Sequence, residues 1–78
     1  MYDLSSAEQA YAVTPSDATN FTQGKCKALY IGGAGAVVAV VGGSAVTFAA
    51  VPAGTTLWVA ATRVNATGTV GTNIVALY

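Results

Sequence analysis

The chain has 78 residues, of which 54% are hydrophobic and 8% charged, and its three acids and three bases balance to a net charge of zero. One cysteine and no histidine exclude an intrachain disulfide and leave too few ligands for an ordinary zinc, haem or iron–sulfur site within one chain. Soluble monomers usually carry about a quarter to a third charged residues on their surface. We therefore expect one domain whose neutral surface is largely covered by neighbouring subunits.

Residues 1–24 differ in composition from the rest of the chain. They hold all three acids, are rich in Ser, Thr, Asn and Gln, and show no sustained apolar period. Ser5-Ser6-Ala7-Glu8 fits a capping box and indicates a short helix around 6–12, and Thr14-Pro15-Ser16-Asp17 is typical of a turn. We interpret residues 1–24 as an extended arm that orders on a partner, with a disordered tail as the alternative.

From residue 25 onward, short runs of β-branched and aromatic residues alternate with turn signals about every 8–12 residues. The predicted strands are 25–31, 36–41, 45–51, 55–65 and 72–78. The predicted turns are 32–35, 42–44, 52–54 and 67–71, where glycine supplies positive φ. The sequence therefore predicts an all-β fold, a small antiparallel β-sandwich or barrel of about five to seven strands over residues 25–78, preceded by the extended N-terminal arm.

Residues 28–62 carry no charge, and a run of this length is sufficient to span a bilayer. Six glycines and Pro52 interrupt the run, however, and Leu, Ile and Phe are scarce in it. The N-terminus is acidic, whereas a secretory signal begins with a basic region followed by an apolar core. We expect neither a membrane span nor a secretory signal.

No catalytic group is expected. The acids lie in the arm, and strand alternation directs Cys26 away from its neighbours Lys25 and Lys27, so that Cys26 is predicted to be a buried, inert thiol. The glycines of 32–35 lack the third glycine and the following helix of a dinucleotide-binding fingerprint. Lys25, Lys27 and Arg63 are too few for nucleic-acid binding. The chain is expected to be no enzyme and to bind no cofactor, metal or nucleic acid.

An ordered set of motifs resembles a known family. The motifs are Pro15-Ser16-Asp17, Asn20-Phe21, Lys25-Cys26-Lys27-Ala28-Leu29-Tyr30, Val51-Pro52-Ala53-Gly54 and Ala61-Thr62-Arg63-Val64-Asn65-Ala66-Thr67-Gly68-Thr69. Over roughly residues 15–78 the chain resembles the short head spike-base proteins of gene transfer agents (GTAs) and related tailed phages and prophages. The resemblance implies a structural virion protein, made in the bacterial cytoplasm, on the outer surface of an icosahedral capsid. There it would bind the major capsid protein as a decoration or cement subunit, or as the base of a head spike that carries a fibre protein.

We expect homo-oligomers, trimers or pentamers, that pack around a rotation axis through apolar faces. The predicted interface residues are the cations Lys25, Lys27 and Arg63, which would meet acids, and the aromatic residues Tyr30, Trp58 and Tyr78. Two alternatives stay open. A glycan-binding module of a fibre or spike would stack sugars on Trp58 or the tyrosines, and a self-polymerising β-fibre would form if an edge strand such as 37–41 stayed unpaired.

Overall fold

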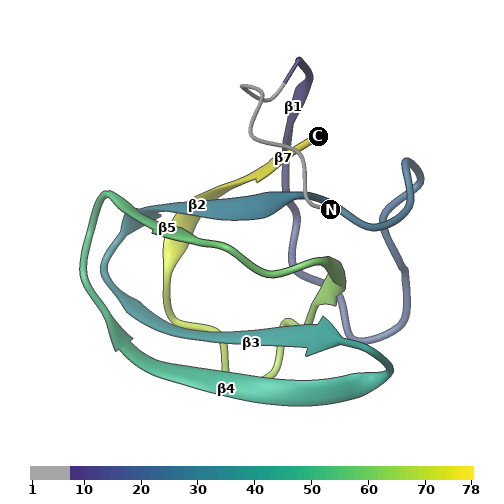
Figure 1. The fold of residues 1–78 in the computed structure, drawn as a ribbon. Coiled ribbons are helices and arrows are strands. Elements are labelled where there is room, and N and C mark those ends of the chain that lie inside the picture. Colours follow the sequence, from purple (N-terminus) through teal and green to yellow (C-terminus); the bar gives the residue numbers. More distant parts are fainter. Residues whose placement is uncertain (1–7) are drawn as a thin grey trace.

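The computed structural model describes residues 8–78, and all regular elements of this part are β-strands. They form two antiparallel sheets, a four-stranded sheet of order β1-β7-β2-β5 and a three-stranded sheet of order β4-β3-β6 (Figure 1). The strands are β1 (Ala10–Ala12), β2 (Ala28–Gly33), β3 (Gly35–Val41), β4 (Ser44–Val51), β5 (Thr55–Leu57), β6 (Ala61–Val64) and β7 (Thr72–Leu77). The predicted all-β antiparallel fold is confirmed.

The core lies between the inner faces of the two sheets. Alternation along β2 places Leu29 and Ile31 on the inner face, and both are fully buried together with Val37 of β3 and Val64 of β6. Strand β3 is buried on its outer face too, because the loop that precedes β7 covers it. In that loop a Cβ added at Gly68 would lie 3.0 Å from Cγ2 of Val38. An apolar run buried on both faces was expected for this strand.

The segment 32–35 is not the predicted hairpin turn. Strand β2 continues to Gly33 in the four-stranded sheet, and β3 begins at Gly35 in the other sheet. Gly35 has a φ of 145°, and an added Cβ there would lie 2.8 Å from the backbone nitrogen of Gly71. The glycines permit close backbone packing at a crossing between the sheets, which local turn signals do not distinguish from a hairpin.

The predicted long strand 55–65 is also two strands. Strand β5 pairs with β2 in the four-stranded sheet, whereas β6 pairs with β3 in the three-stranded sheet. Between them the N–H of Val59 donates to the carbonyl of Leu57 at 2.9 Å, which makes a tight corner around Trp58. The break lets Leu57 and Val64 reach the core from different sheets.

The turn predicted at 42–44 is confirmed as a two-residue hairpin. Gly42 and Gly43 have φ values of 60° and 84°, and Val41 pairs with Ser44 across the turn. Both central residues of a type I′ turn need positive φ, which glycine adopts without strain. This hairpin joins β3 to β4, the outer strand of the three-stranded sheet.

Residues 8–24 lie on the body of the same subunit. Within them Ala10–Ala12 form β1 and pair antiparallel with β7, so the helix indicated by the capping box is wrong for these residues, and its residues 6–7 lie outside the described part. Residues 16–21 then run alongside β6. There the N–H of Ser16 donates to the carbonyl of Val64 and that of Phe21 to the carbonyl of Thr62, each at 2.9 Å. In residues 8–78 no helix has the length and apolarity that a bilayer span requires.

Candidate assembly surface

Tyr30 is the large residue on the outer face of the four-stranded sheet. It pairs with Val75 of β7 and Thr56 of β5, and Val75 pairs with Ala12 of β1. Residues that face one another across a sheet share a face, so these four form an uncharged row across all four strands. Tyr30 is 39% exposed and Ala12 is exposed, which leaves the row open to a partner.

Trp58 lies at the corner between β5 and β6 and is 80% exposed, more than the other large hydrophobic residues of the described part. Burying an indole removes a large apolar area from water, and aromatic residues dominate the binding energy of many interfaces. An indole this exposed contributes little to the packing of its own subunit. Trp58 is therefore available as an interface residue.

Lys25 and Lys27 are exposed on either side of Cys26, which is 3% exposed. This arrangement is the alternation that the sequence indicates. The thiol of Cys26 lies 3.6 Å from the carbonyl oxygen of Val59, and burial raises its pKa, which disfavours the reactive thiolate. The lysines thus present positive charge at the start of β2 while Cys26 joins the core.

Arg63 is half-buried in β6 and is engaged within the subunit. Its Nε donates to Oδ1 of Asn65 at 2.9 Å, and one terminal nitrogen donates to Oδ1 of Asn20 at 3.3 Å. Asn20 belongs to the N-terminal segment that runs alongside β6, so the guanidinium joins this segment to the sheet. Arg63 therefore has a structural part within the subunit besides its predicted interface role.

Asp17 closes a clasp between the N-terminal segment and the loop after β6. Its carboxylate accepts the backbone N–H of Thr67 at 2.9 Å and the Thr67 hydroxyl at 2.6 Å. The hydrogen bond from the Thr67 side chain is the largest cause that lowers the pKa of Asp17, the backbone N–H of Thr67 is the second, and the charge of Arg63 adds to them. Sequence reasoning missed this clasp, because the two residues are 50 positions apart.

Replacement of Asp17 with asparagine should lower the melting temperature near neutral pH and have little effect in acid. The pKa of Asp17 is lower in the folded chain than its ordinary value of 3.8, so its contribution is present above that value and is lost as the pH falls through the folded pKa. Thermal unfolding at about pH 7 and about pH 2.5 measures the effect. Glu8→Gln removes an acid from the same segment outside the clasp and is the control. An Asp17→Asn effect that is equal at both pH values would contradict this role.

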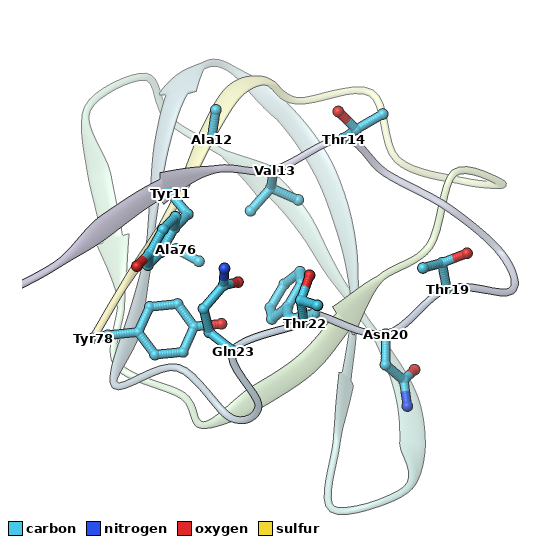
Figure 2. Close-up of a pocket in the computed structure, with 11 residues that line it drawn as sticks. Tyr11, Ala12, Val13, Thr14, Thr19, Asn20, Thr22, Gln23, Ala76 and Tyr78 are labelled. Atoms are coloured by element: carbon cyan, nitrogen blue, oxygen red, sulfur yellow. The ribbon is translucent and has the colours of Figure 1, made fainter.

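Tyr78 lines a pocket of about 200 Å³ beside β1. Figure 2 shows Tyr78 and Tyr11 at one end of the pocket and Thr19 and Asn20 at the other. The two tyrosine rings meet edge to face with centroids 5.6 Å apart, and the Tyr78 hydroxyl donates to the carbonyl of Gly24 at 2.9 Å. Burial raises the pKa of Tyr78. Its ring and hydroxyl thus hold the N-terminal segment of their own subunit.

The lining of this pocket is uncharged, and its volume is below the roughly 300–1,000 Å³ of typical small-molecule sites. In residues 8–78 no three potential metal ligands of the His, Cys, Asp and Glu types lie together. Of the six predicted interface residues, Tyr30, Trp58 and the two lysines are exposed, whereas Arg63 and Tyr78 are partly buried and donate hydrogen bonds within their own subunit.

Strand β4 is the open edge of the three-stranded sheet, whereas the sequence prediction named another strand as the candidate edge. The strand 37–41, named as a candidate edge, is the central strand β3, whereas β4 has β3 as its one partner in the sheet. From Ser44 to Ala50 only Phe48 is partly buried, and Val46 is 42% exposed. The exposed side chains of β4 are neutral, so no charge in the sequence marks this edge. The signal that could have indicated it is the hairpin at Gly42-Gly43, which precedes the strand.

No family model and no curated protein matches this sequence. Among solved structures, it matches a chain in the capsid of a native GTA particle, computed with C5 symmetry. The two are 34% identical with a TM-score of 0.81, and the match covers 92% of this chain and 83% of the other. Identity at this level over nearly the whole fold shows that the two chains belong to one family. The expectation of a capsid protein is thereby confirmed. This chain therefore belongs to the family of that GTA capsid component and is a structural protein of a GTA-type or phage-type capsid.

Proposed function

We propose that this protein is a homo-oligomeric subunit on the outer surface of the capsid, bound to the major capsid protein as a decoration or cement subunit or as the base of a head spike. The observation that carries the proposal is the match to a GTA capsid chain over 92% of the sequence. A trimer would suit a cement position and a pentamer would suit a fivefold vertex, where a spike fibre protein could attach.

The surface chemistry supports a role in assembly. Trp58 and Val70 are 80% and 67% exposed, the row around Tyr30 is neutral, and strand β4 carries no charge. Exposed apolar groups that a free monomer would leave in water become favourable once a neighbour covers them. The thiol of Cys26 is buried in the core of its own subunit.

The exposed lysines are the proposed electrostatic contacts with the capsid. Lys25 and Lys27 are exposed just before β2 begins, and the carboxylate of Asp17 accepts a hydrogen bond from Thr67. Positive side chains at an interface rim raise the association rate with an acidic partner and make binding sensitive to salt. Arg63 contributes less directly in this scheme, because it also holds Asn20 and Asn65.

Changing Lys25 and Lys27 together to alanine is expected to weaken binding to capsids of the same particle assembled without this chain. Each exposed ion pair contributes about 0.2–1 kcal/mol, so the double variant should bind about two- to thirtyfold more weakly and with a smaller salt dependence. Co-sedimentation with capsids over a salt series measures both quantities. Lys25→Arg with Lys27→Arg keeps the charges and is the matched control. Unaltered affinity and salt dependence in the alanine variant would refute the electrostatic contact.

A further inference from the structure

The open edge of β4 has the properties of a strand that pairs with another chain. Strand β4 is the longest strand of the fold, with eight residues, and it contains neither a charged residue nor a proline. Natural sheets protect such edges with lysine, proline, bulges or short strands. The register irregularity of β4 lies near its end, where Ala50 has a φ of 54°, so most of the edge is regular.

The pairing with β3 determines which backbone groups of β4 face outward. Thr47 pairs with Val38, but the Val38 N–H donates to Oγ1 of Thr69 and its carbonyl accepts from Asn65. Val38 and Thr47 are therefore a non-hydrogen-bonded pair, and hydrogen-bonded pairs alternate with such pairs along an antiparallel ladder. The N–H and C=O groups of Ala45 and Thr47 consequently point away from β3, toward the open edge.

The other outer strand of the three-stranded sheet is covered by its own subunit. The carbonyls of Ala61, Thr62 and Val64 in β6 accept N–H groups from Cys26, Phe21 and Ser16, respectively. In the four-stranded sheet the outer strands are β1 and β5, of three residues each.

Strand β1 has an outward edge that complements that of β4. The N–H of Val13 donates to Ile74 and that of Tyr78 donates to Gln9, so the intervening Ala10 and Ala12 turn their backbone groups away from β7. The ladder to β7 extends from residue 8 to residue 13, which is close to the length of the regular part of β4. Alanine side chains on β1 would not obstruct a second strand.

The two edges lie at opposite ends of the subunit, with β1 at the top of the view and β4 at the bottom (Figure 1). A ring of identical subunits needs two different patches that face each other in each interface, whereas a twofold dimer uses one patch twice. Edges at opposite ends of one subunit supply the two patches that a head-to-tail interface needs, and the rotation between neighbours decides whether the assembly closes into a ring.

We propose that β4 of one subunit pairs with β1 of a second copy of this chain, head to tail, and so joins the sheets of neighbouring subunits in a closed ring. This inference rests on the proposed homo-oligomer and names its interface. Main-chain hydrogen bonds supply the affinity in such strand addition, and the residues whose backbone groups face outward on the two strands are alanine and threonine, which allow close approach. Neither edge then remains free for further growth.

A proline at position 47 tests the edge without breaking the β3–β4 ladder. Thr47→Pro removes an outward N–H, whereas its matched control Thr47→Val changes the side chain and keeps the backbone donor. Native mass spectrometry should show wild-type rings for Thr47→Val and monomers for Thr47→Pro, with β-sheet circular dichroism retained in both. Wild-type rings in a folded Thr47→Pro variant would overturn the proposal.

Cysteine trapping identifies the partner strand. Four double variants combine cysteine at Ala45 or Thr47 with cysteine at Ala10 or Ala12, and oxidised glutathione serves as the oxidant. A disulfide needs Cα atoms about 4.4–6.8 Å apart, so a variant with facing positions should give a ladder of linked subunits on a non-reducing gel. The single variants should stay unlinked, because Cys26 is buried.

The outcomes separate this proposal from the proposed function. Dimers from Thr47→Cys alone would show β4–β4 pairing and overturn the head-to-tail arrangement, as would the absence of a ladder in all four double variants. Polydisperse filaments of the wild type would overturn the closed ring. If rings persist and capsid binding is intact while β4 stays unlinked, the interface assignment fails and the proposed function stands.

Discussion

Replacement of Gly35 with alanine is expected to lower the free energy of unfolding by about 2–6 kcal/mol, a large fraction of the total. Its φ of 145° lies where residues with a side chain rarely occur, and an added Cβ would lie 2.8 Å from the nitrogen of Gly71 and 2.9 Å from the carbonyl carbon of Val70. Backbone strain of about 1–3 kcal/mol and overpacking of about 1–3 kcal/mol would act together. A chain of this length has roughly 4–12 kcal/mol of stability in total. Chemical denaturation at a fixed protein concentration measures the loss.

Gly54→Ala is the matched control for Gly35→Ala. Gly54 has a φ of 79°, but nothing lies within 4 Å of the position of an added Cβ. This variant contains the strain without the clash and should lose about 1 kcal/mol. If both variants lost the same free energy of unfolding, the close backbone approach at the crossing between the sheets would not be the cause.

Leu29→Ala is expected to give the second large effect, a loss of about 2–5 kcal/mol in the free energy of unfolding. Leu29 is fully buried in β2, between Leu57 of β5 and Ala76 of β7 in the four-stranded sheet. The change removes apolar contacts from the centre of the core and leaves a cavity that rigid strands on both sides cannot close. The melting temperature should fall by about 8 °C or more, which differential scanning calorimetry measures.

Leu77→Ala has the same chemistry at a half-buried position and serves as the comparison. Leu77 follows the buried Ala76, so alternation along β7 places it on the outer face of the sheet. Its truncation should cost about 1 kcal/mol. Equal losses for Leu29→Ala and Leu77→Ala would contradict the assignment of the core to the inner faces.

The parts of the fold that local chemistry determines could be predicted from the sequence. Gly42-Gly43 between two β-branched runs specifies a type I′ hairpin, and the apolar run 36–41 indicates a strand buried on both faces. The crossing at Gly35 and the corner at Trp58 could not be predicted in this way. In both places the chain changes sheet, and this depends on which distant strands cover it.

In the candidate site, too, local features could be predicted and contacts between distant residues could not. The alternation of Lys25, Cys26 and Lys27 predicted two exposed charges around a buried thiol, as the structure has them. The internal bonds of Arg63 and Tyr78 involve Asn20 and Gly24, which are 43 and 54 positions away, and no local pattern indicates them. The open edge of β4 depends on strand order, which alternation along one strand does not specify.

The mass of the purified protein in solution, alone and mixed with capsids of its own particle assembled without it, shows whether the chain is an oligomeric capsid subunit. Native mass spectrometry and light scattering should show one discrete ring, a trimer or a pentamer, and saturable binding of that ring to capsids. The copy number would distinguish a threefold cement subunit from a fivefold spike base. A stable monomer that does not bind capsids would contradict the account.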